Sequence, residues 1–103
     1  MKNELMEIMS MFALAADINI KAQRRGQLYT EKHCPFKVGQ KLIVNKLGNK
    51  INVVIKLIHF DEHGGVEGMA HLQVQPKKKD WTTMKGRNNF TICHDEDIIR
   101  IVE

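Results

Sequence analysis

The sequence predicts an α+β domain in which an N-terminal helix packs on a small five-stranded antiparallel β-barrel. The stretch 41–74 reads as three strand-like runs joined by two short turns, which is typical of an antiparallel meander. Two further short strand-like runs follow it, at 89–94 and 98–102. Before the meander, apolar residues recur at spacings of three and four, which indicates a helix.

Length and composition limit the chain to one soluble domain. A chain of 103 residues is of single-domain size and can bury a modest core. It is 43% hydrophobic and 27% charged, and this balance excludes a disordered chain. We therefore expect one domain over 1–103, made of a helical segment at 1–26 and a barrel at 36–103.

The helical segment begins with good capping chemistry. Asn3 can cap it, and Glu4 and Glu7 place negative charge where the helix dipole favours it. Basic residues followed by Gly26 predict that the helix ends there. Its apolar stripe is wider than that of a surface helix, so we expect the barrel or a second copy of the chain to cover it. The stripe comprises Leu5, Ile8, Met9, Phe12 and Ala16, widened by Met6, Met11 and Leu14.

A connector over 27–37 leads to the strands. The second run, 51–60, is apolar on both faces, so it should be a central strand. Its alternation places Ile51, Val53, Ile55, Leu57 and His59 on one face. The other face, with Val54, Ile58 and Phe60, is the predicted seat of the helix. The third run, 66–74, would place the small residues Gly68 and Ala70 inward on a sharply curved strand.

Two runs resemble those of known small barrels. The run 36–42 (FKVGQKL) and the ending 97–101 (DIIRI) resemble SH3-like barrels of the Tudor or KOW type. The helix-then-barrel order, with FDEH at 60–63 closing the second strand, is similar to Sm-like RNA-binding proteins. The resemblance covers 36–103 and implies a closed SH3-like barrel. From the residues themselves, 95–97 would form a tight turn, or one turn of 3₁₀ helix, before the last strand.

The distribution of charge favours a nucleic-acid partner. The net charge is +4, and the segment 77–87 holds five basic residues and one acid, so this segment accounts for all of it. Lysines and arginines neutralise phosphates, and an indole stacks on bases. The alternative is a solvated loop whose tryptophan folds back on the barrel. The candidate nucleic-acid-binding residues are Lys77, Lys78, Lys79, Trp81, Lys85 and Arg87, together with Arg24 and Arg25 if the helix end lies on the same side.

The sequence favours neither catalysis nor a metal. We find no Gly-rich phosphate cradle and no nucleophile–base signature, so we expect no enzyme and no cofactor. The pairs His33–Cys34 and Cys93–His94 offer zinc ligands, but neighbours on a strand point to opposite faces and no C-x-x-C spacing occurs. We expect no metal, and thiols that are free or joined in a single disulfide. His59, His63 and His71 read as polar strand and turn residues.

The N-terminus suggests neither export nor a membrane span. Glu4 and Glu7 stand where a signal peptide carries basic residues, and Asp17 interrupts the apolar run. We expect a cytoplasmic protein.

Three functional hypotheses remain. The first is a non-catalytic accessory or regulatory protein that binds DNA or RNA through the basic loop. The second is an adaptor or inhibitor, of the kind that phages and mobile elements encode, that docks on a host enzyme or defence complex through the helix or a barrel edge. The third is a homodimer in which two 5–16 segments pack together.

Overall fold

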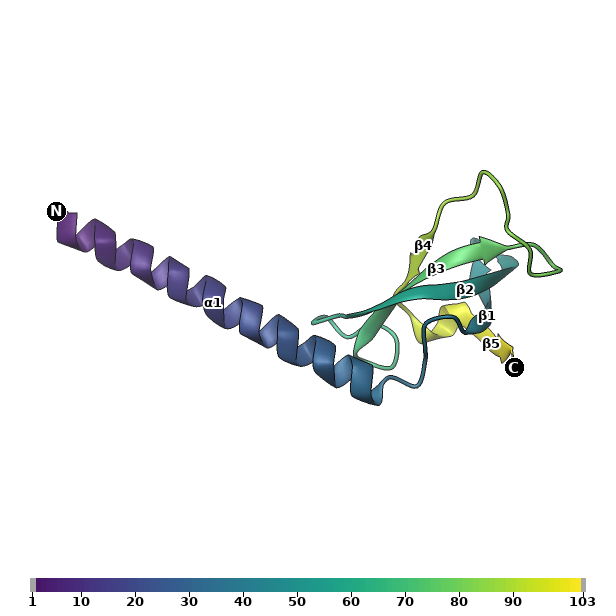
Figure 1. Ribbon diagram of the computed structural model, residues 1–103, viewed down its shortest axis with the longest axis horizontal. Coiled ribbons are helices and arrows are strands. Elements are labelled where there is room, and N and C mark those ends of the chain that lie inside the picture. Colours follow the sequence, from purple (N-terminus) through teal and green to yellow (C-terminus); the bar gives the residue numbers. More distant parts are fainter. Residues whose placement is uncertain (1, 103) are drawn as a thin grey trace.

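The predicted α+β architecture is confirmed. The computed structural model describes the backbone of residues 2–102 and the side chains of 3–11 and 13–102, so the predicted role of Phe12 lies outside the described residues. A single long helix precedes an antiparallel sheet of five strands in the order β4-β3-β2-β1-β5 (Figure 1). The elements are α1 (Lys2–His33), β1 (Lys41–Lys46), β2 (Asn49–Phe60), β3 (Ala70–Lys77), β4 (Phe90–Ile92), the 3₁₀ turn η1 (Asp95–Asp97) and β5 (Ile98–Val102).

Tight turns set the register of the sheet. Leu47 and Gly48 join β1 to β2, and both have positive φ angles, 52° and 82°. This is the backbone of the two-residue hairpin turn whose twist matches that of the strands it joins. Along β3, buried and half-buried residues alternate without a break. The core between the strands consists of Phe36, Leu42, Val44, Val53, Ile55, Val66, Leu72, Val74 and Ile92.

A bulge in β2 overturns the predicted faces of that strand. The register with β3 shifts between Ile55 and Leu57, so the alternation reverses after Ile55. Leu57 and His59 are therefore exposed instead of lining the core. Ile58 faces the core beside Leu72, on the opposite side of the sheet from Val54. The predicted apolar seat at 54, 58 and 60 is thus divided between two faces.

The third strand starts later than predicted. Glu67 and Gly68 have φ angles of 55° and 71°, and a bridge joins Val66 to Ala70, so 66–69 is a turn. Gly68 lies exposed in this turn and Ala70 is the first residue of β3. Gly65 is required by close approach, because a Cβ there would overlap the carbonyl oxygen of Ala70. These glycines are therefore needed for the turn before β3, whereas the prediction had assigned Gly68 to a sharply curved strand.

The described strands form an open sheet. Within residues 2–102, β4 and β5 are the two edges and no pairing joins them, so the finer prediction of a closed barrel is not shown. β4 is also shorter than the predicted 89–94, with three residues that pair with 72–74 of β3. Pro76, which has no N–H to donate, lies just beyond the last of these pairs.

The predicted end of the helix at Gly26 is wrong, because α1 continues to His33. The ring of Phe60 lies against the helix backbone at this point, and a Cβ on residue 26 would overlap the Cδ2 of that ring. Glycine here allows the helix and β2 to approach closely, at a cost of about 1 kcal/mol in helix propensity. Residues 17–20 are also helical, and the Nζ of Lys21 pairs with the carboxylate of Asp17 at 3.1 Å.

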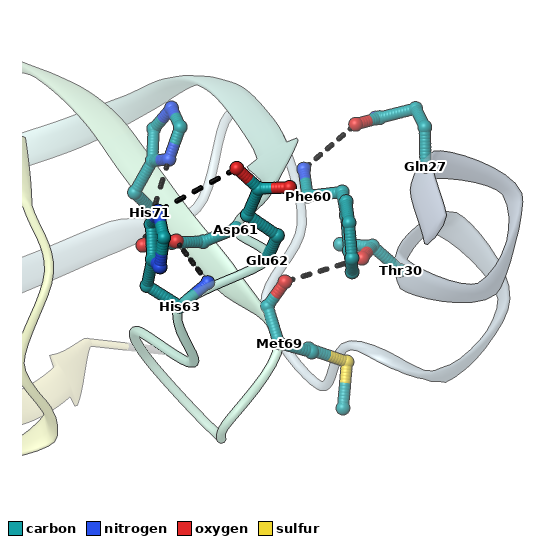
Figure 2. A network of polar contacts seen from close by, with 8 residues as sticks. All are labelled: Gln27, Thr30, Phe60, Asp61, Glu62, His63, Met69 and His71. Carbon is teal, nitrogen blue, oxygen red and sulfur yellow. Dashed lines mark hydrogen bonds and ion pairs between the residues drawn. The ribbon is translucent and has the colours of Figure 1, made fainter. Parts of the chain in front are cut away.

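Polar contacts fix the last turns of α1 to the end of β2. The side-chain N–H of Gln27 donates to the carbonyl of Ile58 at 3.0 Å, and its oxygen accepts from the backbone N–H of Phe60 at 2.7 Å. Thr30 is fully buried, and its hydroxyl donates to the carbonyl of Met69 at 3.4 Å (Figure 2). These contacts satisfy backbone groups that the sheet leaves open at its end.

The rest of the helix projects away from the sheet (Figure 1). Every described side chain from 3 to 22 is exposed, so the prediction that the barrel covers the apolar stripe is wrong. The molecule measures 66 × 30 × 21 Å and its radius of gyration is 18.8 Å. A compact chain of this length would have a radius of about 13 Å. Attachment at residues 23–30 alone gives this elongated shape.

The Gly26 contact can be tested with Gly26→Ala. In an exposed helix this change stabilises by about 0.5–1 kcal/mol. Here we expect destabilisation by about 1–3 kcal/mol, because the new methyl group overlaps the Phe60 ring. Urea unfolding followed by circular dichroism measures the change. Ser10→Ala, in the exposed part of α1, is the control and should be neutral or stabilising; equal stabilisation by both changes would show that the contact is absent.

Candidate nucleic-acid interface

The basic loop, residues 77–87, leaves the end of β3 and returns to β4 (Figure 1). Its first half is a hydrogen-bonded turn. The N–H of Trp81 donates to the carbonyl of Lys78 at 2.9 Å, and the N–H of Lys78 donates to the carbonyl of Thr82 at 3.0 Å. The side-chain amide of Asn52, on β2, donates to the carbonyls of Lys78 and Lys79 at 3.4 Å each. The loop is therefore anchored to the sheet through its backbone, which leaves its side chains available.

Asp80 organises the tip of this turn. Its Oδ1 accepts from the hydroxyl of Thr82 at 2.6 Å and from the Thr82 N–H at 3.1 Å. Hydrogen bonds from the Thr82 side chain and then its backbone lower the pKa of Asp80 below its usual value of 3.8. The one acid of the loop is therefore used for structure.

Trp81 is half-buried against the sheet instead of extended into solvent. The Nζ of Lys41, at the start of β1, lies 5.1 Å from the centre of the indole ring, within cation–π range. The backbone of Trp81 has a φ of 68°, a left-handed conformation that is costly for a bulky residue. Such strain persists where the surroundings enforce it, and it is concentrated at functional sites.

The register of the sheet adds basic residues that the loop sequence did not reveal. Arg100 pairs with Ile43, Ile43 with Asn52 and Asn52 with Lys77, so these four form one row across β5, β1, β2 and β3. Lys41 and Lys50 occupy alternate positions of β1 and β2 on the same, outer face of the sheet. The sequence shows which side chains of each strand share a face, but it does not show which residues pair across neighbouring strands.

A shallow groove of about 330 Å³ lies where the loop meets this outer face. Its lining combines apolar side chains with lysine ammonium groups and an amide, a mixture that suits a ligand with an apolar ring and a phosphate. The lining residues are Ile43, Lys50, Ile51, Asn52, Lys77, Lys79 and Met84. We call the basic loop together with Lys41, Lys50 and Arg100 the basic face.

Most of the predicted basic residues are accessible. Lys78, Lys79, Lys85 and Arg87 are exposed, while Lys77 is half-buried and its ammonium donates to the hydroxyl of Thr83 at 3.5 Å. In the part of the chain that the structure describes, none of these groups forms an ion pair with a carboxylate. Their charge is therefore available to a partner.

Arg24 and Arg25 do not join this set. They lie on α1 near the far end of β2, where Arg24 lines a hollow with His59, Phe60 and His71. The basic loop leaves from the opposite end, beside residues 49–52 of β2 (Figure 1). The two groups of basic residues are thus separated by the length of the strand.

Two acids, Asp61 and Glu62, lie at the end of the sheet that faces α1 (Figure 2). Glu62 accepts a hydrogen bond from the Gln23 side chain at 3.0 Å, and Asp95 accepts one from the N–H of Glu67 at 2.9 Å. Part of the acidic charge of the domain is therefore held at the opposite end of β2 from the basic loop. The acids that these contacts and the end of β2 place here are Asp61, Glu62, Glu67 and Asp95.

Two histidines of the sheet form a pair, and both cysteines are free. His59 and His71 lie directly opposite each other on β2 and β3, with ring centres 5.2 Å apart, and the Nδ1 of His71 lies 4.0 Å from Asp61 (Figure 2). Cys34 and Cys93 are free and half-buried. Across residues 2–102, no three potential ligands converge on a metal-sized site.

No protein-family model, curated protein or solved structure matches the chain. Over residues 2–102, no helix combines the length and the apolarity needed to cross a bilayer.

The Asp80 turn should respond to acid. Because the pKa of Asp80 is lowered on folding, its carboxylate stabilises the turn above pH 3.8, and this contribution is lost as pH falls through the lowered pKa. Trp81 is the only tryptophan, so its fluorescence reports on the turn. We expect a red shift below pH 3.8 while far-ultraviolet circular dichroism still shows the sheet.

Asp80→Ala should give the same red shift at neutral pH, because alanine offers no acceptor to Thr82. Glu96→Ala removes an exposed acid outside the loop, in the 3₁₀ turn before β5, and should leave the spectrum unchanged. Equal shifts in both variants would contradict the role of Asp80.

Proposed function

We propose that the protein is a non-catalytic nucleic-acid-binding protein, accessory or regulatory in role, that holds the phosphate backbone on its basic face. We also propose that its sheet is of the SH3-like type. The meander order β4-β3-β2-β1-β5, the bulged central strand and the 3₁₀ turn before β5 support this assignment.

One observation carries the functional proposal. Lysines that are far apart in the sequence, such as Lys41, Lys50 and Lys79, gather with Arg100 on one side of the domain, while the acids around the end of β2 lie away from them. Bringing like charges together is unfavourable in the free protein unless solvent and salt screen them. A polyanion relieves that repulsion and releases its counterions on binding.

The position of Trp81 supports contact with unpaired bases. Its ring is half-buried, so its orientation is fixed before a ligand arrives, and the adjoining groove is partly apolar. Stacking on a fixed aromatic ring costs less conformational entropy than stacking on a mobile one. The ammonium of Lys41 lies beside the ring and supplies a positive charge for the neighbouring phosphate.

A second candidate function has its own observation. The projecting part of α1 exposes large apolar side chains, among them Met11 (71% exposed) and Leu14 (61% exposed). Apolar surface of this extent is typical of an interaction site. An adaptor or inhibitor that docks on a larger protein, as phage and mobile-element proteins do, would use it.

The triple variant Lys77→Glu, Lys78→Glu, Lys79→Glu tests the first proposal. Filter binding of a short oligonucleotide, double- or single-stranded, should weaken by on the order of 100-fold near 0.15 M salt. The slope of log affinity against log salt should fall by about three. Retained affinity with an unchanged slope would overturn the proposal.

The matched control is Arg24→Glu, Arg25→Glu, Lys32→Glu, which changes the net charge equally on exposed positions of α1. We expect its salt slope to remain near that of the unaltered protein, because these residues lie at the far end of β2. An equal loss in both variants would show that net charge, and not the basic face, governs binding.

Replacing Trp81 separates stacking from charge. Trp81→Ala should weaken binding to single strands by about 1–3 kcal/mol with the salt slope unchanged, because only a stacking partner is lost. Trp81→Phe should recover part of the affinity. Tyr29→Ala, which removes an aromatic ring that is 54% exposed on α1, is the control and should bind normally.

A further inference from the structure

The projecting part of α1, which we call the apolar rod (residues 5–20), exposes its apolar side chains to solvent. Its described large apolar side chains from Leu5 to Ile20 are between 46% and 71% exposed: Leu5, Ile8 and Ile20, with Met6, Met9, Met11, Leu14 and Ile18. Most helical stability in water comes from packing an apolar face, and a bare helix of this kind is marginal. We therefore expect a partner molecule to cover this apolar surface in solution.

The exposed area matches what a subunit interface requires. The chain exposes 7913 Å². A compact monomer of 11.9 kDa would expose about 6,000 Å², so the excess is about 1,900 Å². A standard interface buries about 800 Å² per partner. The excess is thus sufficient for a stable helix–helix interface, with area to spare.

The charges on α1 indicate what the partner is. The helix begins with Lys2, carries Glu4 and Glu7 in its first two turns and Lys21, Arg24 and Arg25 just before it meets the sheet, with only Asp17 charged between these acids and bases. A second copy of the same helix, running antiparallel and centred near Leu14, brings Glu7 beside Lys21 and brings Glu4 to the level of Arg24 and Arg25. By symmetry each contact occurs twice, as a two-fold interface requires.

The alternative pairing of two copies is unfavourable. In a parallel pair, Glu4 and Glu7 would face their own counterparts, and so would Arg24 and Arg25, so both ends would repel. The two helix dipoles would also run in the same direction. In the antiparallel pair the charges at the helix ends attract and the helix dipoles oppose each other. This arrangement also places the two sheets at opposite ends of the paired helices, where they do not collide.

We propose that the protein is a homodimer held by antiparallel packing of the segments 5–20 of two α1 helices. Each sheet then presents its basic face at one end of the assembly. The dimer does not rest on nucleic-acid binding, because its mass can be measured without a ligand.

The mass test is direct. Sedimentation equilibrium of the full chain should give twice 11.9 kDa at micromolar concentration. The double variant Ile8→Glu, Leu14→Glu should sediment as the monomer, with at least a hundredfold weaker association. Leu28→Glu, which changes a leucine that is 65% exposed on the part of α1 beside the sheet, is the control and should stay dimeric. A monomeric unaltered chain at 100 micromolar overturns the proposal.

Charge exchange tests the orientation. Glu4→Arg with Glu7→Arg should weaken self-association at least tenfold, and so should Lys21→Glu with Arg24→Glu. An equimolar mixture of the two variants should recover the affinity of the unaltered protein, because each helix end then meets its opposite charge. In a parallel dimer neither variant alone would associate more weakly, and that result would overturn the antiparallel arrangement. Unchanged binding of a short oligonucleotide, which can reach only one basic face, by Glu4→Arg with Glu7→Arg keeps this outcome separate from that of the basic face.

Discussion

The junction between α1 and β2 is the contact on which the shape of this protein depends. Gly26 lets the Phe60 ring lie against the helix backbone, and Gln27 bridges the backbone of Ile58 and Phe60 with two hydrogen bonds. Because these contacts involve only the last turns of α1, they fix the direction of the helix without covering it. The elongated shape of the molecule and the exposure of its apolar helix segment both follow from this limited contact.

The same junction keeps two surfaces apart. The rod begins at the acidic end of the sheet, whereas the basic face lies at the other end of β2. A dimer formed through the rods would leave both basic faces open and point them away from each other. On a polyanion long enough to reach both, two linked faces would bind more tightly than one, since the second contact becomes intramolecular. Self-association and nucleic-acid binding would thus reinforce each other.

Errors in the sequence predictions share one cause. Gly26 read as a helix end because glycine usually ends helices, but here it accommodates a ring from a residue 34 positions away in the sequence. The face of Leu57 was misassigned because a bulge reverses the alternation, and a bulge leaves no local mark. Gly68 read as part of a strand although its positive φ places it in a turn. Each case depended on a contact or a dihedral angle that the local pattern does not encode.

The sequence by itself determined the α+β class, the meander, the last strand with its 3₁₀ turn, and the loop that carries the excess charge. Period, turn residues and composition are local properties, so the chain displays them directly. Only the tertiary structure decided that Lys41, Lys50 and Arg100 share a face with the loop, that Arg24 and Arg25 do not, and that the apolar helix stands uncovered. Those outcomes follow from strand register and from one close approach between a glycine and a ring, which are set by packing between distant residues.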